Sequence, residues 1–414
     1  MTLTAPGNAL GSTVHGRGAR RQGVVIAALV CTFAFSADVF GRGFWFLFVA
    51  GFLIVLGCLR EIPRIPVRPE LIMLALFAAA YSVATSGKLT DVLVALTFPV
   101  GYLVGLLVVQ TGEPRNVQLR RLILALVAGM TTHGVLNAVT NFLNFGWHPD
   151  ERSLPDFWSS AALAATLQGT LFIPLVGFAY YGLAIRQGNR MLPVLTAACL
   201  LVAAVYNFIT ASRTIFVVGL ITLGVCAVSS LWLRPTRHRK SVMMVVLGGL
   251  LIVTTAYQLN LFQLPSMVDE SPLIRRLTAP DSSALAEDPR FARWAYVLGH
   301  FWDHTTGGLY FRANIGYVHN LWLDAYDTAG LFALLMLGGF TIGAVALFWR
   351  VVRKGEVLAE LRVLLVGLLI AFLAQFMTEP ILDGMPTLFV VFCVLVGGVS
   401  SLRSEAVLHE HVSI

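Results

Sequence analysis

The sequence predicts an all-α integral membrane protein with about twelve transmembrane helices. Hydrophobic residues make up 57% of its 414 positions and charged residues only 12%, whereas soluble domains carry about 25% charged residues. The apolar residues also gather in stretches of roughly 18–28 positions, each long enough to cross a hydrocarbon core of about 30 Å. These observations exclude a water-soluble fold.

Twelve apolar stretches follow one another, and most are separated by short polar hinges. Residues 1–22 are rich in Gly, Ser and Arg and are predicted to form a loose tail. Nine stretches occupy 23–258, a polar loop covers 259–320, three more stretches occupy 321–402, and 403–414 form a second tail. The predicted spans are 23–40, 42–58, 69–86, 91–110, 120–143, 158–185, 191–209, 213–233, 241–258, 321–349, 361–378 and 384–402.

Positive charge predicts the orientation of these spans. Twenty of the 29 Lys and Arg residues fall in the two tails and in alternate hinges. Because cytoplasmic loops are enriched in Lys and Arg, this side and both termini are predicted to be cytoplasmic. The inner hinges carry, in chain order, Arg60, Arg64 and Arg68; Arg115, Arg120 and Arg121; Arg186 and Arg190; Arg234, Arg237, Arg239 and Lys240; and Arg350, Arg353, Lys354 and Arg362. The outer side keeps Arg42, Lys88, Arg152, Arg213, Arg275, Arg276, Arg290, Arg293 and Arg312.

The charge and the cysteines give no sign of other binding functions. The net charge of +7 lies in hinges beside membrane spans, so it indicates membrane topology and not nucleic-acid binding. All five cysteines fall within apolar stretches and none forms a CxxC motif. They are interpreted as small apolar residues, with neither a disulfide nor a metal site predicted.

The long outer loop contains one predicted amphipathic helix, from 290 to 304. One face would carry Phe291, Trp294, Ala295, Leu298, Phe301 and Trp302, and another Arg290, Arg293, Val297, His300 and His304. We expect the Trp and Phe side to lie in lipid or against the bundle. The Gly-rich segment 303–317 is predicted to form turns.

Four residues from separate parts of the chain are predicted to lie together at the outer membrane boundary. They are Arg152, Arg213, Arg290 and His319. Arginine binds phosphate oxygens with two parallel hydrogen bonds, and histidine can accept a proton near neutral pH. This set of side chains suits the binding of a diphosphate and the activation of a hydroxyl.

Other interpretations apply to several of these outer residues. An Arg at a helix end often anchors the helix at the interface, and Arg42 and Arg312 are interpreted in this way. Arg213 has no other charge nearby, and charge close to the membrane marks function by default. His319 can alternatively be a helix cap.

No metal site is predicted on the outer side. His300 and His304 are four residues apart but lack a third ligand at a matching position. Glu379 and Asp383, in the last outer hinge, can approach the site from a neighbouring span. No acidic cluster is spaced to hold a divalent ion on a diphosphate.

Five segments resemble those of the O-antigen ligase/polymerase family of bacterial envelope glycosyltransferases. They are ERSLPDFW before the sixth predicted span, ASRTIFVVGL at the eighth, RFARW in the loop, GGLYF after it, and HNLWLDAYDTAGLFALLML where the chain re-enters the membrane. The family has ten to fourteen spans and one large periplasmic loop late in the chain. The resemblance therefore implies a bacterial inner-membrane protein whose active face is periplasmic.

The resemblance also implies roles for individual residues. Arg213, Arg290 and His319 would be catalytic, and Arg152 would bind substrate. Three more candidate substrate-binding residues come from position alone: Arg293 on the polar face of the loop helix, Asn320 beside His319, and Tyr326, which shares the His319 face if the helix is extended back to it.

Two activities of the family remain open for this chain. The ligase transfers O-antigen from an undecaprenyl-diphosphate carrier to lipid A–core, and the polymerase extends the glycan on its carrier. One dominant outer loop favours the ligase, while the short segment of about 12 residues after the last span disfavours a third branch that glycosylates proteins. The expected partners are the lipid-linked donor, the lipid A–core acceptor and membrane lipids, with no nucleic acid, metal or other cofactor.

A transporter or flippase for an anionic lipid or solute is the alternative from another class. It would carry arginines near the bilayer midplane, broken helices and repeated halves. Here the predicted cations lie at the outer rim, and no internal repeat is visible in the sequence.

Overall fold

The computed structural model describes residues 9–58, 67–85, 89–111, 114–146, 153–184, 191–233, 289–354 and 357–402. This part of the chain is mostly helical and includes one two-stranded hairpin. Its elements are α1 (Ala9–Ser36), η1 (Val39–Gly41), α2 (Gly43–Cys58), α3 (Pro69–Ala84), α4 (Leu89–Gln110), α5 (Arg115–Phe145), β1 (Ser153–Pro155), β2 (Ala162–Ala164), α6 (Ala165–Thr170), α7 (Ile173–Ala184), α8 (Met191–Ile209), α9 (Thr214–Leu233), α13 (Pro289–Gly299), α14 (Tyr310–Ile315), α15 (Leu321–Lys354), α16 (Ala359–Thr378), α17 (Ile381–Gly384) and α18 (Pro386–Leu402).

Apolar helices lie at all of the predicted spans that fall within the described residues. Six helical segments are long and apolar enough to cross a membrane: α4, α5, α6 with α7, α8, α15 and α16. Shorter apolar helices form parts of α1, α2 and α9, and the whole of α3 and α18. The predicted span 241–258 lies outside the described residues. The class of a helical, membrane-embedded protein is therefore supported, and the number of twelve spans stays a prediction.

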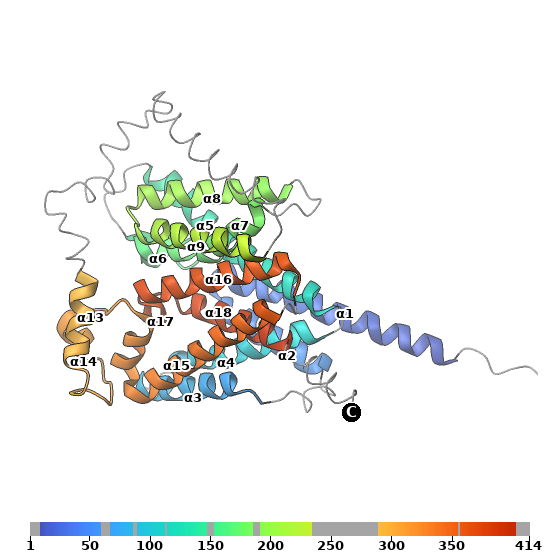
Figure 1. Cartoon of the computed structure of the whole chain (residues 1–414), viewed down its shortest axis with the longest axis horizontal. Coiled ribbons are helices and arrows are strands. Elements are labelled where there is room, and N and C mark those ends of the chain that lie inside the picture. Colours follow the sequence, from blue (N-terminus) through green and yellow to red (C-terminus); the bar gives the residue numbers. More distant parts are fainter. Residues whose placement is uncertain are drawn as a thin grey trace, which may run out of the picture.

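The helices run side by side in one bundle (Figure 1). In this view α16 and α18 cross the middle, with α5, α7, α8 and α9 above them and α3, α4 and α15 below. α13 and α14 cover one end of the bundle, near α17, and α1 begins at the opposite end. Helical structure starts at Ala9, so it extends into the segment predicted as a tail.

Glycines allow a close helix contact between α4 and α18. A Cβ atom on Gly105 would lie 1.9 Å from the carbonyl oxygen of Val394, and one on Gly397 would lie 1.9 Å from that of Tyr102. No larger side chain fits at either position without moving a helix. Small residues that let backbones meet are the usual means of packing helices in membranes.

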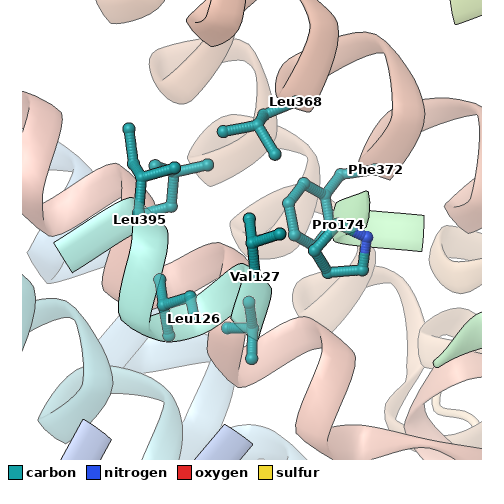
Figure 2. Close-up of a pocket in the computed structure, with 8 residues that line it drawn as sticks. Leu126, Val127, Pro174, Leu368, Phe372 and Leu395 are labelled. Carbon is teal, nitrogen blue, oxygen red and sulfur yellow. The ribbon is translucent and has the colours of Figure 1, made fainter. Parts of the chain in front are cut away.

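The bundle is tightly packed where α5, α7, α16 and α18 meet. Figure 2 shows the apolar side chains around a small void at this junction, including Leu126, Val127, Pro174, Leu368, Phe372 and Leu395. The void leaves about 10 Å³ for the centre of a water molecule, which is the lower limit for holding one. Its lining offers no hydrogen bonds, so this part of the core is structural.

The predicted span 321–349 is not one continuous helix, because α15 breaks at Gly330. This glycine has φ 77°, a left-handed conformation that suits glycine. The backbone of 305–309 lies along the break: the amide of Leu331 donates to the Thr305 carbonyl (2.8 Å) and the amide of Leu309 donates to the Asp327 carbonyl (2.8 Å). These bonds satisfy polar groups that a broken helix would otherwise expose.

The predicted span 158–185 also begins differently. Its first residues form part of the antiparallel β1–β2 hairpin, in which Ser153 pairs with Ala164, and the helix starts only at Ala165. The apolar run AALAATL suggested a helix throughout. The hairpin forms because the buried Asp156 binds the amides of Trp158 and Ser159, a turn contact that Asp favours.

The sidedness of the bundle is open to a direct test. We expect Ser283→Cys, in a cysteine-free background, to react with a membrane-impermeant thiol reagent on intact spheroplasts, because the positive-inside rule puts 259–320 outside. Ser404→Cys, in the second tail, is the matched control and should react only after permeabilisation. The opposite pattern would reverse the orientation and remove the periplasmic site.

Candidate active site

Side chains from α13, from the start of α9 and from the residues before α15 meet at Glu379. This residue ends α16, and its side chain is 0% exposed. Its Oε1 atom accepts hydrogen bonds from Arg290 Nη2 (2.8 Å) and from the Thr214 hydroxyl (2.9 Å). Its Oε2 atom lies 3.8 Å from His319 Nδ1. The prediction that Glu379 can approach the site from a neighbouring span is thus confirmed.

His319 lies beside this carboxylate without a hydrogen bond to it. The 3.8 Å separation is beyond hydrogen-bond distance, and neither His319 Nδ1 nor Glu379 Oε2 has a hydrogen-bond partner among the described residues. The His319 side chain is 24% exposed, so the ring has a buried anionic neighbour and also reaches solvent. A group placed in this way can exchange a proton with an external molecule.

The backbone at His319 is held in an unusual conformation. Its φ is 59°, a region that non-glycine residues seldom occupy and that is found where surrounding structure enforces it. The carboxylate of Asp324 accepts hydrogen bonds from the amides of Val318 (3.2 Å) and Asn320 (3.3 Å), on either side of His319. The start of α15 therefore fixes the position of this histidine.

Asn320 is the residue that caps α15. Its Oδ1 accepts hydrogen bonds from the amides of Trp322 (3.1 Å) and Leu323 (3.2 Å), as an N-cap Asn does. The sequence allowed His319 to be the helix cap, but Asn320 is the residue that caps the helix. This contact gives Asn320 a structural role, and its substrate-binding role stays a prediction.

The loop helix α13 holds the other side of the same turn. Arg293 Nη1 donates to the Tyr317 carbonyl (2.9 Å), and Trp294 Nε1 donates to the Val318 carbonyl (2.9 Å). Arg290 is on the same helix, and its side chain is 22% exposed. One helix therefore supplies a cation to the site and supports the backbone that presents His319.

The predicted helix 290–304 is observed as α13, but it ends at Gly299, five residues early, and its buried face was assigned wrongly in part. Val297, placed on the polar face, is fully buried against Phe311, Val318 and Tyr326. Phe291, Leu298 and Trp302 remain exposed, as expected for side chains that would face lipid. The predicted turns at 303–317 also contain a short helix, α14, whose amides at Phe311 and Arg312 donate to the Asp327 carboxylate.

Tyr326 does not share a face with His319. Its ring stacks on Phe301, and its hydroxyl donates to the Phe301 carbonyl. The helical extrapolation was wrong because His319 lies before the helix, with a left-handed backbone. The Tyr326 side chain therefore joins the loop to the bundle.

Arg213 precedes α9 at the same end of the bundle. The next residue, Thr214, donates its hydroxyl to Glu379, so the backbone of Arg213 is within one residue of the site. Its side chain is partly exposed, with a buried Nε atom. Arg152, the fourth predicted member, lies outside the described residues.

Arg312 differs from a simple membrane anchor. It forms an ion pair with Asp383, and its guanidinium lies 4.6 Å from the centre of the Tyr317 ring. Burial raises the pKa of the Asp383 carboxyl, and Arg312 opposes that rise. This pair ties α14 to the α17 turn, next to the residues that precede His319.

A second buried polar cluster was not found by sequence reasoning. His133 Nε2 lies 2.6 Å from Asp156 Oδ1, and Asn137 Nδ2 donates to the same oxygen (3.2 Å) and to Gln168 Oε1 (3.0 Å). The sequence of α5 contains a pattern that indicates this cluster, because His133, Asn137 and Asn141 recur at four-residue spacing. They place a polar stripe along the second half of α5.

This cluster holds the hairpin that follows Arg152. Burial raises the pKa of Asp156, but hydrogen bonds from His133, Ser159 and Asn137 outweigh burial and hold it well below its ordinary range. Two residues after Gln168, the Thr170 hydroxyl accepts a hydrogen bond from Gln375 Nε2 (2.8 Å), one turn before Glu379.

Asp156→Asn is expected to destabilise the protein by on the order of 3 kcal/mol, since it removes a buried carboxylate that is hydrogen-bonded to His133, Asn137 and backbone amides. The difference in unfolding free energy between the parent and this variant should be fully present above about pH 4, the ordinary Asp pKa. It should shrink as the pH falls further, because the folded-state pKa is depressed. Thermal unfolding in detergent at several pH values measures it. Asp303→Asn, at an exposed position, is the control and should change little; equal stability of the two variants would contradict the prediction.

No group of three or more His, Cys, Asp or Glu side chains in the described part of the chain is placed to hold a metal ion. Glu379 and Asp383, the carboxylates of the last predicted outer hinge, each pair with an arginine. The absence of a metal requirement stays a prediction.

The helices and this site define a class: a multi-helix membrane protein with arginines, a histidine and a buried glutamate gathered at one end of its bundle. No protein-family model and no curated protein sequence matches the chain.

Proposed function

We propose that the protein is an O-antigen ligase, which transfers O-antigen from an undecaprenyl-diphosphate carrier to a sugar hydroxyl of lipid A–core. One observation carries the proposal: Arg290 and His319, remote in sequence, both approach Glu379 at the bundle end that also holds Arg213. The membrane-embedded helices suit a lipid-linked donor, and the motifs described above resemble those of the ligase/polymerase family.

The donor diphosphate would bind to Arg213 and Arg290. Guanidinium groups form paired hydrogen bonds with phosphate oxygens, and they stabilise negative charge that develops on a leaving group. In the structure Arg290 bonds to Glu379. When the diphosphate binds, it would compete with this carboxylate for Arg290, and Glu379 would become available to the nearby imidazole.

His319 would act as the general base. Its Nδ1 faces Glu379, so Nε2 is the nitrogen that would accept the proton of the acceptor hydroxyl. The hydroxyl oxygen forms a bond to the anomeric carbon while the bond from that carbon to the diphosphate oxygen breaks. The electron pair leaves with the undecaprenyl diphosphate, and the single displacement inverts the anomeric centre. Glu379 would be a positioning residue that stabilises the protonated ring.

The lipopolysaccharide of cells that lack the protein tests this function. Lipid A–core without O-antigen, together with long glycan retained on the carrier, is the result expected for a ligase. A single repeat on the core would identify the polymerase of the same family instead. Unchanged lipopolysaccharide would exclude both and favour a transporter or flippase.

Turnover by the purified protein should be unaffected by a strong chelator, since arginines take the place that Mg²⁺ holds in many diphosphate sites. The measurement is transfer of labelled glycan to lipid A–core with EDTA, and with EDTA followed by excess Mg²⁺ or Mn²⁺. Loss of activity that either metal restores would overturn the arginine-based mechanism, and Glu379 and Asp383 would then be the first candidate ligands.

A further inference from the structure

A large apolar groove lies between α9, α15 and α16, far from the candidate active site. Its cavity volume is about 650 Å³, within the usual range of small-molecule sites. α15 contributes its last turns and α16 its first. The groove is therefore at the ends of these helices that are opposite Asn320 and Glu379.

The lining combines an apolar surface with positively charged side chains, as the binding site of an amphiphilic molecule does. Trp232, Phe348, Trp349 and Ile370 are among the apolar side chains that line it, and among the described residues the charged members of the lining are Arg353 and Arg362. Both arginines lie where the groove reaches the end of the bundle, because Arg353 is in the last turn of α15 and Arg362 in the first turn of α16. From Arg362 to Ile370 the helix rises about 12 Å. This rise matches the length of the part of an acyl chain that is nearest the head group.

We propose that this groove binds one anionic phospholipid. Its phosphate would lie between Arg353 and Arg362, and an acyl chain would run along the aromatic and aliphatic lining towards Ile370. Charge decides the class of lipid, because the described part of the lining carries two guanidinium groups and no carboxylate. Basic pockets between transmembrane helices bind anionic head groups in this way.

The two arginines are differently placed for this task. Arg362 donates from Nε to the Val357 carbonyl (3.0 Å), which orients its guanidinium at the start of α16. Arg353 is exposed. Glu360, the nearest described carboxylate in sequence, lines a different pocket with Arg120. A soluble phosphate would leave the apolar lining unfilled, and a neutral lipid would leave the charges unpaired.

Photoreactive lipids test the proposal on the full chain. Phosphatidylglycerol and phosphatidylcholine probes, each with a diazirine near the head of one acyl chain, are added to phosphatidylcholine vesicles that contain the protein. Crosslinked peptides are then mapped by mass spectrometry. We expect phosphatidylglycerol to label the groove on the order of tenfold more than phosphatidylcholine, because each basic residue contributes to selectivity.

Arg353→Gln should lower this preference, and Arg353→Gln with Arg362→Gln should abolish it. Arg353→Gln alone removes an exposed side chain, so it tests the site without disturbing the contact between Arg362 and Val357. Arg350→Gln, on the same exposed end of α15 but outside the groove, is the matched control and should keep the preference. Equal labelling by both lipids in the parent would overturn the proposal. So would an absence of labelling, which would mean that protein fills the groove.

Discussion

His319→Ala should lower the rate of glycan transfer by about 10²–10⁴-fold, the usual contribution of a general base, while the protein stays folded and binds its donor. The parent's rate should also fall on the acidic side, because a protonated imidazole cannot accept a proton. This decrease in rate at low pH should be absent in the variant. The measurement is the pH profile of transfer by purified protein, with thermal unfolding as the check on folding.

A structural role for His319 would give a different pattern. Asn320 caps α15 and Asp324 holds the amides on either side, so removing the imidazole leaves these contacts in place. Loss of thermal stability with an unchanged pH profile would therefore remove the proposed mechanism. His300→Ala is the matched control: His300 is in the same loop, just after α13, and its Nδ1 lies 2.9 Å from the Tyr296 carbonyl. Its activity should stay at the parent's level.

Arg290→Ala should weaken donor binding by roughly 10–100-fold, the value of hydrogen bonds to a charged group, and should lower the transfer rate as well. Arg213→Ala should act in the same direction. Arg290→Lys should restore only part of the loss, because an ammonium is a point charge, whereas a guanidinium can form two parallel hydrogen bonds to one phosphate. Binding of a short-chain undecaprenyl-diphosphate analogue and the rate of transfer are measured separately.

Arg290→Ala also leaves Glu379 buried without its arginine, which destabilises the fold by itself. Glu379→Gln combined with Arg290→Ala removes that charge, so the double variant should regain thermal stability without regaining donor affinity. Recovery of affinity in the double variant would show that the arginine served only to neutralise the glutamate. Arg42→Ala, an exposed arginine in the predicted outer set, is the control and should leave binding unchanged.

The sequence predicted the helices better than their ends and interruptions. Apolar length alone located the helices, because a membrane span needs a fixed number of hydrophobic residues. The break at Gly330 was missed because one glycine in an apolar run is compatible with a continuous helix. Its left-handed backbone depends on the contact with 305–309, which no local pattern reveals.

The candidate site was predicted in its parts but not in its connections. Arg290 and His319 stood out by residue type and position, whereas their meeting at Glu379 depends on how the loop folds onto α16. The Tyr326 assignment failed because it assumed helical geometry before residue 321. The His133–Asp156 pair was missed because its partners are on different elements, and only the stripe along α5 was readable.

The backbone pairing at the α15 break has a consequence for making chimaeras of this protein. Segment 305–309 bonds to the helix on both sides of Gly330, and α13 bonds to the carbonyls just before His319. A graft that exchanged the loop and joined it at residue 320 would separate these partners and remove these backbone hydrogen bonds. The smallest transplantable unit within the described residues is therefore 289–331, loop and broken helix together.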